Sequence, residues 1–155
     1  MTAILQPLPD VYSAGQPSAE QLGTLACDGV RTVINLRAPG EPAAFDEALE
    51  AGRLGLRYVA IPVAGADDIT PATVKRFSRE LAQARDAGDV LVHCGSANRA
   101  GALLALDRGF TGGLPPGEAL SIGRAAGMTT LEPRVSELLA RGPEVAATTA
   151  APGKH

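Results

Sequence analysis

Aromatic residues and cysteines are scarce in this sequence. Its 155 residues include no tryptophan, two tyrosines, three phenylalanines and two cysteines. Nucleic-acid binding usually needs basic patches and stacking aromatics, whereas here 14 basic and 17 acidic residues are mixed along the chain and the net charge is −3. We therefore expect no nucleic-acid partner. Cys27 and Cys94 lie far apart and fit neither a disulfide nor a zinc framework, so we expect no metal and no cofactor.

Long hydrophobic runs are also missing. No window approaches the ~18 apolar residues of a membrane-spanning helix, and residues 1–7 have no basic segment followed by an apolar stretch. These absences predict a soluble, cytoplasmic protein without a membrane partner. The sequence leaves the oligomeric state open.

The length and the C-terminal composition predict the domain organisation. A chain of 155 residues fits one domain, which buries roughly two thirds of its unfolded surface. Residues 142–155 are mostly alanine, threonine, proline and glycine without an apolar period, so we expect a disordered tail there and one folded domain over residues 1–141.

Strand and helix patterns alternate along the chain. This alternation predicts an α/β fold with a central, mostly parallel sheet flanked by helices. Strands are expected at residues 31–36, 57–61 and 90–93. Helices are expected at residues 18–26, 42–51, 70–84, 99–110, 116–126 and 132–141, with Ser18 and Thr70 as N-caps and Pro71 in the first turn.

The loop after the strand at 90–93 carries the main chemical signal. An apolar run ends at His93 and Cys94, passes through Gly95, Ser96, Ala97 and Asn98, and reaches Arg99 where a helical pattern starts. At such a loop, converging backbone N–H groups and a helix N-terminus favour a thiolate and a bound oxyanion. Cys94 is thus the expected nucleophile, Arg99 a two-pronged oxyanion ligand, and residues 95–98 the substrate-binding backbone.

The loop resembles the His-Cys-x5-Arg loop of protein tyrosine and dual-specificity phosphatases. It is more similar to the bacterial tyrosine-phosphatase-like domain found in beta-lactamase-hydrolase-like proteins. Residues 12–18, 29–37 with Glu41, and 56–63 also resemble that bacterial group, so the resemblance covers about residues 8–140. It implies a cysteine-dependent phosphatase-like fold and the hydrolysis of phosphate monoesters through a phosphocysteine.

Two positions depart from the phosphatase pattern. The spacing is Cys-x4-Arg, one residue shorter, and Ala100 replaces the usual serine or threonine after the arginine. A smaller cradle and slow turnover are expected. Two alternatives therefore stay open: a sulfurtransferase or persulfide carrier using Cys94, since rhodanese loops have a similar length, and a non-catalytic oxyanion-binding module.

The resemblance also implies a general acid in the loop near the helix capped by Thr70. Asp67 and Asp68 are the two candidates, and Asp68 is preferred because it stands nearer the helix start. Both aspartates could instead solvate a turn or favour the helix N-terminus.

Three further residues have expected roles outside the nucleophile loop. Arg37 is expected to pair with Glu41 and brace its loop, and His93 to hydrogen-bond the Cys94 loop rather than act as an acid or base. Cys27 follows Leu22 and Leu25 in a helical pattern, so we expect a buried small residue.

Overall fold

The computed structural model of the protein describes residues 2–142. Its strands form one sheet, in which they lie in the order β1-β2-β5-β3-β4. β1 (Ile4–Leu8) runs antiparallel to β2 (Val11–Ala14). The remaining pairings, among β2, β5 (Asp89–His93), β3 (Val30–Asn35) and β4 (Arg57–Ala60), are parallel. The prediction of a mostly parallel sheet is confirmed. The predicted tail lies outside the described residues, apart from Gly142.

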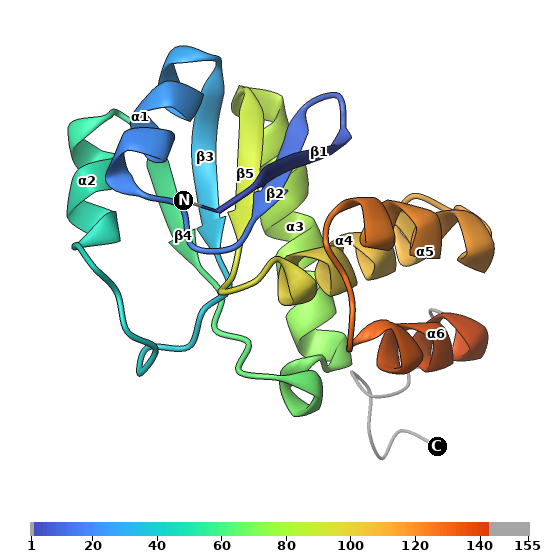
Figure 1. Cartoon of the computed structure of the whole chain (residues 1–155). Coiled ribbons are helices and arrows are strands. Elements are labelled where there is room, and N and C mark those ends of the chain that lie inside the picture. The colour runs from blue at the N-terminus through green and yellow to red at the C-terminus, as the bar shows by residue number, and fades with distance from the viewer. Residues whose placement is uncertain (1, 143–155) are drawn as a thin grey trace.

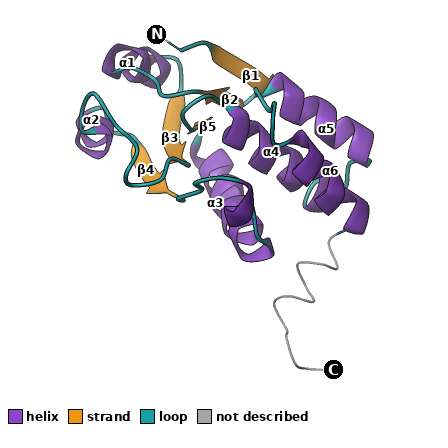
Figure 2. Cartoon of the chain, turned by 60° about the horizontal axis from the view of Figure 1, so that its bottom comes forward, coloured by secondary structure: helices purple, strands orange, loops and turns teal. Residues whose placement is uncertain are grey.

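Helices cover both faces of the sheet (Figures 1 and 2). α1 (Ala19–Cys27) and α2 (Glu47–Arg53) lie on one face. α3 (Pro71–Ala87) and α4 (Asn98–Phe110) cover the other face, and α5 (Pro116–Ala125) and α6 (Glu132–Arg141) pack against α4. Because strand side chains alternate between faces, Val90 and Val92 join the larger core under α3 and α4, whereas Leu91 joins the smaller core under α1 and α2. No helix within residues 2–142 is long and apolar enough to cross a membrane.

The predicted caps begin two of the helices. The Ser18 hydroxyl accepts a hydrogen bond from the Gln21 N–H, and the Gln21 side chain accepts one from the Ser18 N–H, which completes a capping box at α1. Thr70 likewise caps α3 through the Thr73 N–H. These local interactions explain why the starts of α1 and α3 could be predicted from the sequence.

The predicted helix at residues 42–51 is wrong at its start, because α2 begins at Glu47. The Asp46 carboxylate caps α2 by accepting a hydrogen bond from the Leu49 N–H. Before this helix, the Pro42 carbonyl accepts a hydrogen bond from the Arg37 side chain instead of from a helical N–H. Residues 42–45 therefore belong to the loop between β3 and α2.

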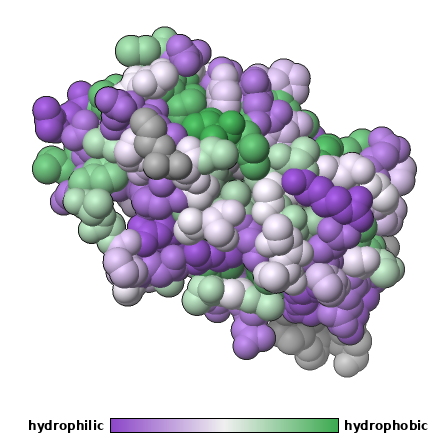
Figure 3. All heavy atoms as spheres, in the orientation of Figure 1, coloured by the Kyte–Doolittle hydropathy of each residue, from purple (hydrophilic) through white to green (hydrophobic). Residues whose placement is uncertain are grey.

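The sequence analysis missed the first two strands. Ile4–Leu8 lies at the edge of the sheet, where Pro7 is tolerated. Ile4 and Tyr12 are partly buried against the smaller core. In the space-filling view, hydrophobic residues gather between α1 and β1, close to this packing (Figure 3).

Cys27 is exposed, so the prediction of a buried residue is wrong. Leu22 and Leu25 face the sheet and are buried, but Cys27 stands two positions after Leu25 at the end of α1. Two residues along a helix turn the side chain by about 200°, which carries Cys27 away from the core.

The register of the parallel strands gathers four chain segments at one edge of the sheet. His93 pairs with Ala14 on one side and with Asn35 on the other, and Asn35 pairs with Ala60. The loops that follow these strands must therefore start side by side. In an open sheet, this carboxyl edge is where ligands bind.

Candidate active site

Cys94 lies at the base of the loop between β5 and α4. Its backbone N–H donates to the Ala14 carbonyl at 3.2 Å, and its side chain is 0% exposed. The neighbouring Gly15 forms a single antiparallel bridge with Ser96. A Cβ on Gly15 would lie 2.7 Å from the Gly95 carbonyl oxygen, so glycine is needed for this close approach. β2 thus holds the first half of the loop.

Ala97 turns the loop into α4. Its φ of 73° is left-handed, which costs a residue with a Cβ about 1 kcal/mol, and its carbonyl accepts the first helical hydrogen bond from the Gly101 N–H. Gly127, in the turn after α5, packs against it: a Cβ there would lie 2.5 Å from the Ala97 Cβ. The strained turn is therefore supported from outside the loop.

The Arg99 guanidinium lies over this loop and is held from the other side. Nη1 donates to Oε2 of Glu41 at 2.6 Å and to the Val63 carbonyl at 2.8 Å, and Nη2 donates to Oε1 of Glu41 at 3.0 Å. A Cβ on Gly95 would lie 3.0 Å from Nη2, which places the guanidinium directly above the loop. Glu41 and Val63 therefore occupy three of the five N–H donors of Arg99 and leave Nε–H and one Nη2 hydrogen for other partners.

Electrostatics reinforce this arrangement. The hydrogen bond to Glu41 raises the pKa of Arg99, and the neighbouring Cys94 contributes to the rise. The hydrogen bond from Arg99 lowers the pKa of Glu41 to about 2, with help from the Ala38 N–H and Arg37. Arg37 Nε lies 3.4 Å from Glu41, so the predicted Arg37–Glu41 pairing is confirmed.

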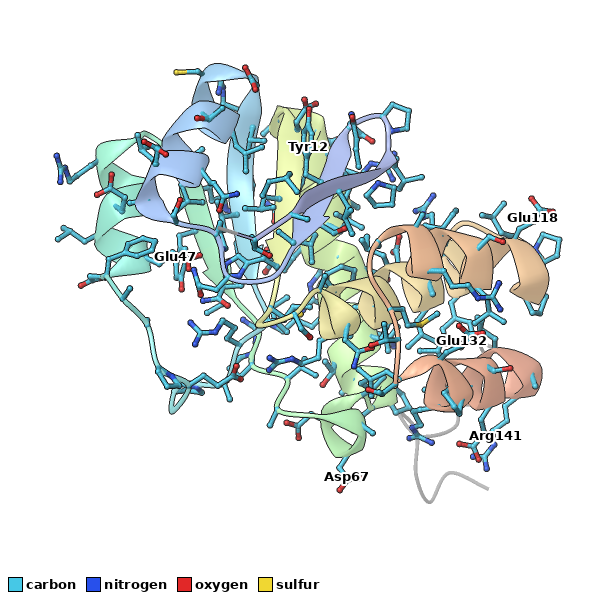
Figure 4. All side chains as sticks on the ribbon, in the orientation of Figure 1. Tyr12, Glu47, Asp67, Glu118, Glu132 and Arg141 are labelled. Atoms are coloured by element: carbon cyan, nitrogen blue, oxygen red, sulfur yellow. The ribbon has the colours of Figure 1, made fainter. Side chains whose placement is uncertain are left out.

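His93 contacts the loop backbone, as predicted. Its Nδ1 lies 3.3 Å from the Cys94 carbonyl oxygen, and its Nε2 lies 2.5 Å from Oε2 of Glu47. The other oxygen of Glu47 accepts a hydrogen bond from the Gln16 side chain, whose own oxygen accepts from Arg37. Figure 4 shows Glu47 at the start of α2, on the side of the helix that faces the sheet.

The side chain of Asn98 supports the loop from outside. Its amide donates to the Thr130 hydroxyl at 2.7 Å and accepts from the N–H groups of Thr129 and Leu131. Only the backbone of Asn98 is thus left for the substrate-binding role expected from the sequence. Ala100 is fully buried and brings no hydroxyl to the site.

Asp67 and Asp68 lie in a short 3-10 turn between β4 and α3. Oδ2 of Asp68 accepts a hydrogen bond from the Ala64 N–H at 2.7 Å, and both aspartates line a surface pocket with residues 64–66. Asp67 points outward from the turn (Figure 4). The Val63 carbonyl, just before this turn, accepts the hydrogen bond from Arg99. The two aspartates therefore lie on the chain segment next to the Cys94 loop.

Two side chains around the loop were missed by the sequence analysis. Gln16 falls within the resembling segment at residues 12–18, yet nothing in its type pointed to a role. Glu47 lies 46 residues before His93, and an isolated glutamate in a helix usually indicates a solvated face. Only the packing of α2 on the sheet brings Glu47 and His93 together.

The sequence matches a known family of phosphatase-like domains. The family model described as DSP-PTPase phosphatase fused to NAD+ kinase matches residues 9–125, and the chain belongs to this family. It is 38% identical over 118 residues to a beta-lactamase hydrolase-like protein of Xylella fastidiosa and 32% identical to one of Agrobacterium fabrum. Each alignment covers 74% of this chain but only 27% of the relative. The chain thus spans about a quarter of the length of these relatives.

Solved structures show the same fold. A DUF442 protein of Shewanella putrefaciens CN-32, described as a phosphatase candidate, superposes with a TM-score of 0.74 at 30% identity, over 94% of this chain and 92% of that one. TpbA of P. aeruginosa, solved in complex with pTyr, superposes with a TM-score of 0.72 at 21% identity, over 97% and 96% of the chains. The fold is therefore that of tyrosine-phosphatase-like proteins.

Proposed function

We propose that this chain is a phosphatase that hydrolyses phosphate monoesters through a phosphocysteine at Cys94. The observation that carries the proposal is the placement of the Arg99 guanidinium above the Cys94 loop, with Nε and one Nη2 hydrogen left by Glu41 and Val63. These two donors match the spacing of two phosphoryl oxygens. The substrate class is a phosphorylated protein or small molecule.

In the first step, the Cys94 thiolate attacks phosphorus and the bond from phosphorus to the ester oxygen breaks. Arg99 and the N–H groups of residues 95–99 stabilise the charge on the equatorial oxygens. Asp68 donates a proton to the leaving oxygen, which departs as an alcohol. This step leaves a phosphorylated Cys94.

In the second step, water attacks phosphorus and the sulfur leaves as a thiolate. The Asp68 carboxylate takes a proton from that water, which returns both groups to their starting forms. Because Ala100 provides no hydroxyl to stabilise the leaving sulfur, we expect this step to limit turnover. A thiolate nucleophile also requires a reducing compartment, which favours the cytoplasm.

A side-by-side assay tests this proposal on one preparation. We expect weak hydrolysis of an aryl phosphate that vanadate inhibits and that Cys94→Ser abolishes, with little sulfur transfer from thiosulfate to cyanide. Cys27→Ser is the matched control, because Cys27 is exposed at the end of α1, and should keep full activity.

The opposite result would favour the sulfurtransferase function over the phosphatase function. It consists of a Cys94 adduct of one sulfur mass after thiosulfate treatment, fast transfer to cyanide, and ester cleavage that Cys94→Ser leaves unchanged. Binding of vanadate without turnover of either substrate would instead indicate the oxyanion-binding module.

A further inference from the structure

One buried acid near the loop has no part in the two steps above. The Glu47 side chain is only 6% exposed, although it belongs to the first turn of α2. Burial of a carboxylate is costly unless both oxygens have partners, and here His93 contacts Oε2 while the Gln16 amide donates to Oε1 at 2.8 Å. The position of Glu47 is therefore fixed from two sides.

The partners of His93 define where its hydrogens lie. Nδ1 faces the Cys94 carbonyl oxygen, which only accepts hydrogen bonds, so this contact is a hydrogen bond when Nδ1 carries the hydrogen. Nε2 faces the Glu47 carboxyl group, and a bare nitrogen opposite a bare carboxylate would be repelled. A hydrogen between Nε2 and Glu47, carried by either group, makes this contact a hydrogen bond as well, and the contact then holds the ring with Nδ1 aimed at the backbone.

The orientation of the Cys94 carbonyl determines the direction of the next N–H. The peptide that joins Cys94 and Gly95 is planar and trans, so its C=O and N–H groups point in opposite directions. When His93 holds the carbonyl on its own side, the Gly95 N–H points the other way, away from His93. That N–H is the first backbone donor of the loop after Cys94.

We propose that Glu47 is a positioning residue which, through His93, holds the Cys94–Gly95 peptide with its N–H facing the oxyanion site. The inference rests on the proposed function for its kinetic consequence only, because the same N–H would also bind a non-reacting oxyanion. The contacts from Gln16 to Arg37 and from Arg37 to Glu41 continue this network to Arg99. One set of side chains thus supports both the backbone and the guanidinium of the cradle.

Two substitutions at Glu47 separate positioning from charge. In Glu47→Gln the side-chain amide donates to Nε2, so Nδ1 keeps its hydrogen and its aim; in Glu47→Ala this support is lost. We expect Glu47→Ala to weaken vanadate binding at least tenfold and to lower kcat for an aryl phosphate similarly, and Glu47→Gln to restore both to within about threefold of the parent. Glu50→Ala, on the more exposed side of α2, is the matched control and should change neither.

The nitrogen NMR signals of His93 provide a readout that does not depend on activity. The sequence has only two histidines, so His155→Gln leaves His93 as the single source of imidazole signals. We expect a hydrogen on Nδ1 in both the parent and Glu47→Gln. This measurement also serves if Glu47→Ala does not fold.

Three results would overturn the proposal: a bare Nδ1 in the parent, vanadate binding by folded Glu47→Ala within twofold of the parent, or equal damage by the Gln and Ala variants. Failure of the proposed function is distinguishable, because vanadate binding would then respond to Glu47 while the parent hydrolyses no phosphate ester.

Discussion

Two arginine–glutamate pairs in this molecule have nearly the same hydrogen-bond lengths but different surroundings. Arg99 donates from two nitrogens to Glu41 at 2.6 and 3.0 Å, and Arg124 donates from two nitrogens to Glu132 at 2.6 and 2.9 Å. The Arg99 side chain is 14% exposed at the carboxyl edge of the sheet, whereas that of Arg124 is 54% exposed between α5 and α6. The pairing alone therefore says little about function.

The difference lies in what else touches each arginine. Arg99 also contacts the Val63 carbonyl and lies over the nucleophile loop, so its pair with Glu41 aims the remaining donors at one place. Arg124 joins α5 to α6 on the surface, where solvent and salt leave an ion pair little net contribution to stability. Matched substitutions in the two regions should therefore have very different effects.

Replacement of the two arginines by lysine should give the largest contrast. Arg99→Lys keeps the charge but loses the planar fork, and we expect kcat/KM for an aryl phosphate to fall about 100-fold, or ~2.7 kcal/mol of transition-state stabilisation. Arg124→Lys should stay near the parent. A loss below about threefold in folded Arg99→Lys, under ~1 kcal/mol, would show that Arg99 is not the oxyanion ligand.

The aspartates of the turn after β4 offer the next contrast, between a proton donor and a turn residue. Asp68→Asn should lower turnover of an alkyl phosphate at least tenfold more than that of an aryl phosphate, because an aryloxide leaves without a proton. Asp67→Asn should affect both substrates little, since Asp67 points outward. If the selective loss appears in Asp67→Asn instead, Asp67 is the general acid. If Asp68→Asn slows turnover of both substrates equally, Asp68 is not the general acid.

The two cysteines extend the comparison to the opposite end of the sheet. Cys94 adjoins the Arg99 guanidinium, whereas Cys27 is exposed at the end of α1. A nearby cation favours the thiolate form of a cysteine. We therefore expect Cys94, when iodoacetamide reaches it through the loop, to remain reactive at lower pH than Cys27. Site-resolved mass spectrometry against pH measures both rates in one sample, and parallel curves for the two cysteines would remove the basis for the nucleophile.

Local signals explain which parts of the molecule could be predicted from the sequence. The caps at Ser18 and Thr70 act within one helical turn, and the run from Val90 to the Cys94 loop is continuous in the chain. Parallel strands then place the loop at the carboxyl edge without further information. The nucleophile loop and most helices follow from such short-range patterns.

Long-range partners explain what was missed. Glu47 meets His93 only because α2 packs against β4 and α1 on one face of the sheet, and no periodicity encodes that contact. Cys27 continued an apolar pattern, yet the helix turned it outward at its last residue. Residues 42–45 could have started a helix, but the hydrogen bond from Arg37 to Pro42 keeps this segment at the site.

The smallest expected effect concerns stability in acid. The pKa of Glu41 is lowered from 4.5 to about 2 in the folded protein, so the stability it contributes is present above pH 4.5 and is lost as the pH falls toward 2. Glu41→Gln lacks this titration, and its free energy of unfolding should therefore fall less steeply between pH 5 and 2 than that of the parent. Because Glu41 is partly exposed, we expect a difference under about 1 kcal/mol.

Urea unfolding at several pH values measures this slope, with Glu132→Gln as the control from the surface pair. Arg124 also lowers the pKa of Glu132, but the Arg124 side chain is far more exposed than that of Arg99, so salt screens this attraction more effectively. Added salt should therefore erase the change of slope in Glu132→Gln before the one in Glu41→Gln. If salt erases both equally, the Arg99–Glu41 pair is no more shielded from solvent than its surface counterpart, and the contrast between the two regions rests on the neighbours of Arg99 alone.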